Sequence, residues 1–248
     1  MNPIFFENHL NNRILGACVG VSESGLNQPA EIIPNTDSTQ LYELTVIMLV
    51  TVALSILIQE IKGLMMLLPL AYLLIERRRR NRSWTEFGVK RGGYLNALKS
   101  NWHLIVLVVF VIQFIVIVGT SWFIPPFMEH IYSRIPWSPD AGIGVLAGFL
   151  SMIIFVTFVE ELVDRGMIQE RFTNRYGLFI GIVIGSLFMT AMHWAPGDPF
   201  IVLLDLLAVF IDSAIYGLIY WRTWSIFVSW TVHLGVDIFD ILLMILVF

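Results

Sequence analysis

The sequence predicts an all-α fold: a polytopic transmembrane helical bundle of about seven spans, some of them short or re-entrant, that follows a polar N-terminal tail. Of its 248 residues, 57% are hydrophobic and 14% are charged, whereas an ordinary soluble domain has about 25% charged residues. Apolar stretches long enough to cross a hydrocarbon core of about 30 Å recur along the chain. This composition excludes a soluble globular enzyme, a nucleic-acid-binding protein and a disordered scaffold. The lone Cys18 excludes an intrachain disulfide.

Residues 1–40 are predicted to form the polar tail, and residues 41–248 the transmembrane domain. The tail contains Pro29, Pro34 and many Asn and Ser residues, and it lacks the basic start of a signal peptide. Residues 1–43 carry a net charge of −4, whereas the remaining 14 acidic and 14 basic residues balance. The acidity of the chain therefore belongs to the tail and says little about a substrate.

The first apolar stretch runs from Leu44 to Ile75 and is interrupted by the polar segment 59–63. As one helix it would be about 48 Å long, which is too long for a hydrocarbon core of about 30 Å. We therefore expect a hairpin of two short spans with a turn near Glu60–Gly63.

Five later spans complete the predicted bundle. Pro125-Pro126 and the Trp194–Pro199 turn mark helix stops between them. The expected spans are Trp102–Ile124, Ala141–Val159, Leu178–Met192, Phe200–Tyr220 and Ser225–Phe248.

Lysine and arginine residues predict the orientation of the bundle. The loop from Arg77 to Lys99 holds 8 of the 15 basic residues, so we expect it to be cytoplasmic. Alternation then places 125–140 and 194–199 outside and the turns near Arg171 and Arg222 inside. The protein is thus expected to be a multi-pass protein of the cell membrane.

Ionisable residues recur within the predicted spans, although each costs about 2.5–3.5 kcal/mol at mid-membrane. Such residues mark functional sites. Glu161 and Arg165 are four residues apart and can pair on one helix face, which leaves Glu160 free to act. The residues are Glu160, Glu161, His193, Asp205, Asp212, His233, Asp237 and Asp240.

Helix geometry predicts that these groups meet. Counted from the turn at 174–177, Glu160 and His193 lie within roughly 3 Å of the same depth. His233 and Asp237 share one face of the last span, nearer the cytoplasmic side. A carboxylate and an imidazole can deprotonate a water while a second imidazole stabilises an oxyanion, or the same groups could bind a divalent metal such as zinc. Asp205 and Asp212 could line a water-filled cleft or form a separate proton or ion path.

The spacing of these residues resembles the motifs of the CPBP family of intramembrane proteases, which includes CAAX prenyl endoproteases and bacteriocin-processing or immunity relatives. Its Glu-Glu-x-x-x-Arg motif is matched by 160–165, and its His-x-x-x-Asn or Asp motif by 233–237. In its Phe-x-x-x-His motif, His193 matches, but Met189 stands at the Phe position. The resemblance covers roughly residues 141–240, the motif-bearing core.

The resemblance implies a site and a role for each of its residues. Glu160 and His193 would activate the attacking water, and His233 with Asp237 would form the oxyanion site. An ionised Asp cannot donate a hydrogen bond as Asn does, so Asp237 would be protonated, orient His233 or bind a metal. The implied catalytic set is Glu160, Glu161, Arg165, His193, His233 and Asp237, and a metal would use Glu160, His193, His233 and Asp237.

Three functions follow as alternatives. The first is an intramembrane endopeptidase that acts on a membrane-associated protein or peptide at the cytoplasmic side of the bilayer, with no nucleic-acid partner. The second is a catalytically idle scaffold or bacteriocin-immunity protein. The third is an ion-coupled transporter that uses Asp205, Asp212 and Asp240. The sequence does not specify the substrate or the oligomeric state.

Overall fold

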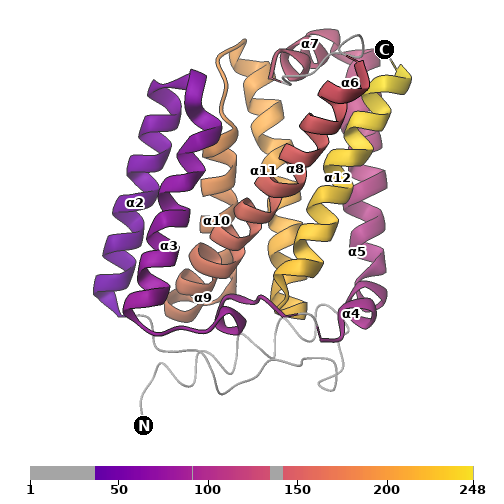
Figure 1. Ribbon diagram of the computed structural model, residues 1–248. Coiled ribbons are helices and arrows are strands. Elements are labelled where there is room, and N and C mark those ends of the chain that lie inside the picture. The colour runs from indigo at the N-terminus through magenta and orange to yellow at the C-terminus, as the bar shows by residue number, and fades with distance from the viewer. Residues whose placement is uncertain (1–36, 91, 135–141, 248) are drawn as a thin grey trace.

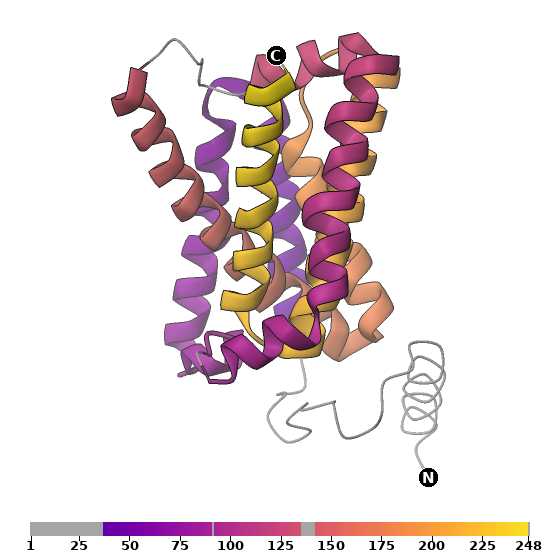
Figure 2. The same cartoon turned by 90° about the vertical axis from the view of Figure 1, so that its right-hand side faces the viewer.

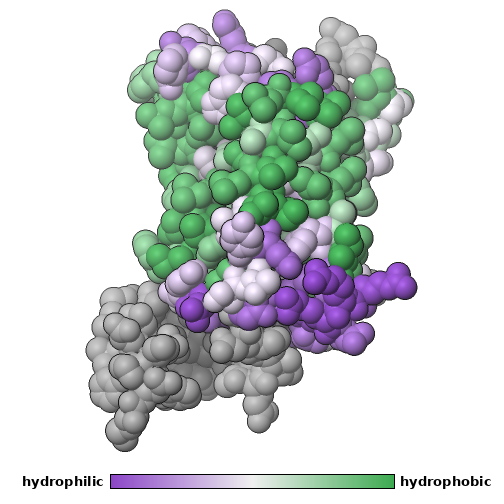
Figure 3. Space-filling model, turned by 90° about the vertical axis from the view of Figure 1, so that its left-hand side faces the viewer, coloured by the Kyte–Doolittle hydropathy of each residue, from purple (hydrophilic) through white to green (hydrophobic). Residues whose placement is uncertain are grey.

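The computed structural model describes residues 37–90, 92–134 and 142–247, which form helices and contain no strand. Five of the described helices are long and apolar enough to cross a membrane, and a sixth, Leu178–His193, is apolar but shorter. On the face shown in Figure 3, hydrophobic side chains form a broad band, and polar side chains gather at its two ends. The chain is an integral membrane protein with a polytopic helical fold, as the composition predicted. The predicted tail, apart from its last residues, lies outside the described part of the chain.

Helices α2 (Ser38–Leu57) and α3 (Leu67–Arg79) form an antiparallel hairpin (Figure 1). The 3₁₀ helix η2 (Gln59–Met66) joins them where the sequence predicted a turn. Asp37 and Gln40 cap the start of α2 reciprocally, so this helix begins before the apolar stretch. The prediction of two short spans was therefore wrong for the first one, because α2 has 20 residues.

The next crossing is built from several helical pieces in sequence. After α4 (Tyr94–Ser100), the chain rises through α5 (Trp102–Val106), the π-helices η4 (Leu107–Ile112) and η5 (Phe114–Gly119), and α6 (Thr120–Phe123). Pro125-Pro126 ends this crossing as expected, and it also begins α7 (Pro125–Arg134), which the sequence analysis did not predict. Proline fits the first turn of a helix because the amide hydrogen that it lacks has no partner there.

Helix α8 (Gly142–Val163) carries the two glutamates of the first motif near its C-terminal end. It continues through the π-helix η7 (Asp164–Gln169) into α9 (Glu170–Tyr176). Its first half leans away from the bundle (Figure 2). Accordingly, Ile143 is 87% exposed, whereas Val163 and the residues that follow it are buried. The motif residues thus lie where α8 enters the protein interior.

Three further helices complete the bundle. They are α10 (Leu178–His193), α11 (Pro199–Thr223) and α12 (Ile226–Val247). α10 packs along α11, and α12 packs against both α8 and α11. The last helix begins at the end of the molecule that holds α4 and finishes at the end that holds α7 (Figure 1).

The basic loop is attached firmly to this core. Its 3₁₀ helix η3 (Trp84–Phe87) places the carbonyl of Phe87 beside the motif glycine Gly166, where a Cβ atom would lie 2.8 Å from that oxygen. The backbone amide of Ile226 donates to the Gly88 carbonyl at 2.8 Å, which fixes the start of α12 to the same loop. Buried ion pairs of Arg82 with Glu170 and of Arg171 with Glu76 add further ties. The loop therefore fixes the ends of the helices that carry the motifs.

Candidate active site

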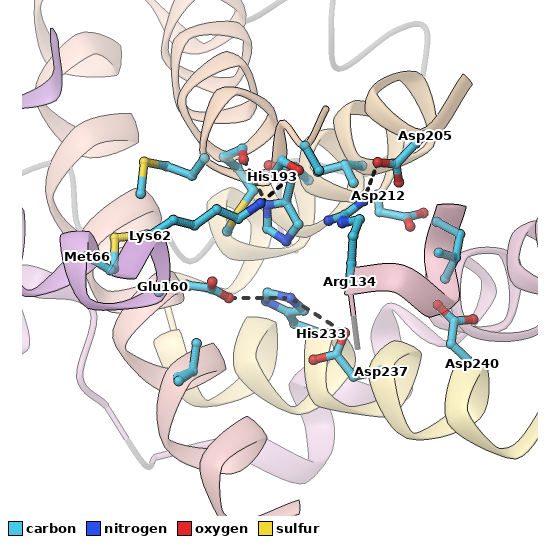
Figure 4. Close-up of a pocket in the computed structure, with 18 of the residues that line it drawn as sticks. Lys62, Met66, Arg134, Glu160, His193, Asp205, Asp212, His233, Asp237 and Asp240 are labelled. Atoms are coloured by element: carbon cyan, nitrogen blue, oxygen red, sulfur yellow. Dashed lines mark hydrogen bonds and ion pairs between the residues drawn. The ribbon is translucent and has the colours of Figure 1, made fainter. Parts of the chain in front are cut away.

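A cavity of about 680 Å³ lies among six helical elements. Residues from η2, α7, α8, α10, α11 and α12 line it, and Figure 4 shows most of its polar groups. The predicted residues among these are Glu160, His193, Asp205, Asp212, His233, Asp237 and Asp240. Three motifs spread over residues 160–237 thus meet at one cavity, as the estimate of their depths predicted.

The two adjacent glutamates of α8 occupy different environments. Neighbouring positions on a helix point about 100° apart, so only one of the two can face the cavity. Glu160 lines the cavity and its side chain is 15% exposed, whereas the side chain of Glu161 is 0% exposed. In the described part of the chain, the Glu160 carboxylate makes an ion pair with His233 at 3.9 Å and no hydrogen bond. Its oxygens therefore remain available to a substrate or a water.

Glu161 is held by three partners. It pairs with Arg165 at 3.5 Å, as the four-residue spacing predicted, and it accepts a hydrogen bond from the hydroxyl of Ser229. His233 Nδ1 lies 3.0 Å from Glu161 Oε1. Arg165 lies behind the cavity, fully buried, and donates to Ser213 Oγ at 2.7 Å. Glu161 and Arg165 therefore support the site without lining it.

His233 stands between the carboxylates. Because Nδ1 faces the carboxylate of Glu161, it carries a proton, and Nε2 is the nitrogen that faces the cavity. Nε2 lies 3.9 Å from Glu160 Oε2 and 4.0 Å from Asp237 Oδ1. The ring of Tyr216 stacks on the imidazole, with centroids 4.7 Å apart. The orientation of His233 is thus fixed by a hydrogen bond on one edge and by an aromatic ring on one face.

His193 is oriented by its own helix. Its Nδ1 lies 2.9 Å from the carbonyl oxygen of Met189. A carbonyl can only accept, so Nδ1 is the donor, and in the neutral ring Nε2 carries the lone pair. This main-chain contact does not depend on the side chain at position 189, where the family motif has Phe. Met189 is itself buried, so the departure from the motif leaves the orientation of His193 intact.

The aspartates of α11 and α12 line the same cavity as Glu160 and His233. Asp205 pairs with Arg134 and lies 3.4 Å from His130 Nε2. Asp212 accepts a hydrogen bond from Gln113 at 2.9 Å. This arrangement favours the prediction that Asp205 and Asp212 line a cleft.

Several groups at the site were missed by the sequence analysis. Lys62 and Arg134 both line the cavity (Figure 4), although each was read as part of a connection between spans. Burial lowers the pKa of Lys62, and the positive charge of Arg134 lowers that pKa further. Ser229 and Tyr216, which hold Glu161 and His233, gave no sequence signal, because a Ser or Tyr on an apolar helix is ordinary.

The divalent metal that the sequence left open stays a prediction. Among the residues that the structure describes, no three His, Cys, Asp or Glu side chains are grouped closely enough to hold a metal ion. The Nδ1 atoms of His193 and His233 face protein acceptors, so a metal would have to use their Nε2 atoms.

Comparison with known proteins gives one match. Residues 142–239 match a family model described as type II CAAX prenyl endopeptidase Rce1-like. No curated protein and no solved structure matches the chain. The matched segment runs from the start of α8 into α12 and includes all six predicted catalytic residues, and the family implies a protease. The segment that provides most of the cavity is therefore similar to type II CAAX prenyl endopeptidases of the Rce1-like family, in agreement with the CPBP family that its motifs resemble.

Proposed function

We propose that this protein hydrolyses peptide bonds of membrane-associated substrates with a water activated by Glu160 and His193. The observation that carries the proposal is the position of Glu160, whose carboxylate lines the cavity without a hydrogen-bond partner in the described chain. The carboxylate of its neighbour Glu161, by contrast, is held by His233, Ser229 and Arg165. A general base needs an accessible lone pair close to the proton that it removes.

The reaction begins with a water held between Glu160 and Nε2 of His193. Glu160 takes one proton from this water, and its oxygen attacks the carbonyl carbon of the substrate. Nε2–H of the doubly protonated His233 donates to the oxyanion that forms. Glu160 then delivers its proton to the departing nitrogen, the C–N bond breaks, and a carboxylic acid and an amine are released.

The supporting groups hold this geometry. Glu161 keeps Nδ1 of His233 protonated, and Arg165 neutralises Glu161. Asp237 Oδ1 lies 4.0 Å from His233 Nε2, and we assign it a role that the sequence did not suggest, that of balancing the positive charge of the ring.

The position of the site on the cytoplasmic side stays a prediction, because η2, α7 and residues 195–196, which alternation places outside, also line the cavity. His233 follows the start of α12 by about 10 Å of helix, and Ile226 at that start is bonded to the basic loop. The positive-inside rule places this loop in the cytoplasm, and the cell membrane is the proposed location.

The test compares peptide termini in host membranes that contain the wild-type protein or the Glu160→Gln variant at matched levels. The exposed Glu129, which does not line the cavity, provides the control Glu129→Gln. We expect new termini with the wild type and the control, and none with Glu160→Gln. Equal termini in all three samples would refute the proposal and favour the idle scaffold or immunity protein.

A further inference from the structure

Lys62 reaches the cavity from the connection η2, outside the segment that matches the family. Its Nζ donates to the carbonyl oxygen of Trp194 at 2.9 Å and to that of His193 at 3.4 Å. These carbonyls lie at the C-terminal end of α10, where helix carbonyls lack partners within the helix. Figure 4 shows the Lys62 ammonium beside His193, on the side of the cavity that also holds Arg134. The hairpin thus places a cation directly beside the proposed water-activating histidine.

The two cations on this side of the cavity, Arg134 and Lys62, differ in their partners. Arg134 has a carboxylate partner in Asp205. Lys62 has no carboxylate within ion-pair distance among residues 37–90, 92–134 and 142–247. An ammonium has three donors, and the two carbonyls use two of them. The side of the cavity around His193 therefore has a cation without a direct carboxylate partner and with a remaining N–H donor, and Asp205 acts on this cation only from beyond ion-pair distance.

The two carbonyls alone do not account for a lysine at this position. A neutral glutamine could also donate to them without the cost of partly burying a charge. The partial negative charge at the end of α10 offsets only some of that cost. An anion bound in the cavity would offset the rest of the cost of burying the Lys62 charge, because it would accept a charge-assisted hydrogen bond from the ammonium.

We infer that Lys62 binds a carboxylate of the peptide substrate and so positions the scissile bond against Glu160 and His193. This inference rests on the proposed peptidase function. The carboxylate could be the free C-terminus of the substrate or an acidic side chain close to the cleaved bond. In both cases Lys62 is a specificity-determining residue of this chain, contributed by its N-terminal hairpin.

The experiment uses a peptide that spans a cleavage site found in the terminus comparison. It is made in three forms: with a C-terminal carboxylate, with a C-terminal amide, and as the amide with one glutamate beside the cleaved bond. The purified full-length enzyme is assayed for KM and kcat on each form. The free energy of a hydrogen bond between two charged groups is larger than that of a neutral hydrogen bond, and the difference corresponds to a change in KM of about tenfold.

For the wild type, we expect a KM about tenfold lower for one of the two acidic forms than for the amide, and the preferred form identifies the source of the carboxylate. Lys62→Gln, which keeps a donor for the carbonyls but has no charge, should reduce this KM ratio to about one. Lys62→Arg should keep the ratio, as should the control Glu60→Gln, a change at an exposed neighbour in η2.

Two results would overturn the inference. One is a wild-type enzyme whose KM does not distinguish the three forms, a result that requires no variant to fold. The other is a Lys62→Gln enzyme that keeps the wild-type KM ratio or changes kcat equally on all forms, as a purely helix-capping lysine would predict. Failure of the peptidase function itself would appear differently, as unchanged cleavage by Glu160→Gln.

Discussion

The adjacent glutamates of α8 allow the same isosteric change to be made in two different environments. Glu160→Gln removes a charge from a cavity-lining side chain whose ion partner lies 3.9 Å away. Glu161→Gln removes a charge from a fully buried side chain that neutralises Arg165 at 3.5 Å and accepts from His233 at 3.0 Å. The two variants should therefore separate catalysis from folding.

The expected magnitudes follow from burial. Breaking a buried ion pair on one side costs about 3–5 kcal/mol, because the remaining charge stays uncompensated. In a chain of this size, about 1 kcal/mol corresponds to a shift in Tm of about 2–4 °C, so Glu161→Gln should lower Tm by about 6–20 °C. Glu160→Gln should cost less stability than Glu161→Gln, because within the described chain Glu160 has a single ion partner at 3.9 Å and no hydrogen bond to lose.

Thermal unfolding in detergent, followed by tryptophan fluorescence, measures both Tm values, and peptide cleavage measures activity. We expect Glu160→Gln to be inactive and to melt at a higher temperature than Glu161→Gln, which should melt clearly below the wild type. Equal Tm values for the two variants would refute the assignment of a structural role to Glu161 and a chemical role to Glu160.

Three further predictions concern packing, metals and orientation. Gly166→Ala should destabilise the protein by about 1–3 kcal/mol because its Cβ would lie 2.8 Å from the Phe87 carbonyl; an unchanged melting curve would contradict this close approach. Cleavage should persist in 1,10-phenanthroline, since no step is routed through a metal; loss of activity that added Zn²⁺ restores would disprove the metal-free mechanism. In a Cys18→Ser background, Ser100→Cys beside the basic loop should react with a membrane-impermeant thiol reagent only from the cytoplasmic side, and labelling from outside would reverse the proposed orientation.

Helix periodicity made part of the site predictable. The spacing of Glu161 and Arg165 fixes their pairing because both lie on one helix face. The depths of Glu160, His193 and His233 could be counted from the turns because each helical residue advances by a fixed rise. These quantities depend only on local geometry.

Other features could not be predicted because they depend on contacts between distant segments. Lys62 was read as part of a turn, yet its Nζ lies 2.9 Å from a carbonyl of Trp194. Arg134 lies in the segment 125–140 that was predicted to be an outside connection, yet α7 places it in the lining of the cavity. Nothing local distinguishes either side chain from a solvated one.

The sequence by itself determined the membrane class, the helical crossings and the set of ionisable residues, because the cost of transferring polar groups into lipid acts on each segment separately. Only the tertiary structure decided which of the two adjacent carboxylates faces the cavity without a hydrogen bond from the described residues and which is bound by neighbouring side chains. Glu160 and Glu161 are chemically identical neighbours, and they differ because α12 brings His233 and Ser229 to one of them and α8 turns the other toward the cavity. Their division of roles is therefore set by packing between helices that lie about 70 residues apart in the chain.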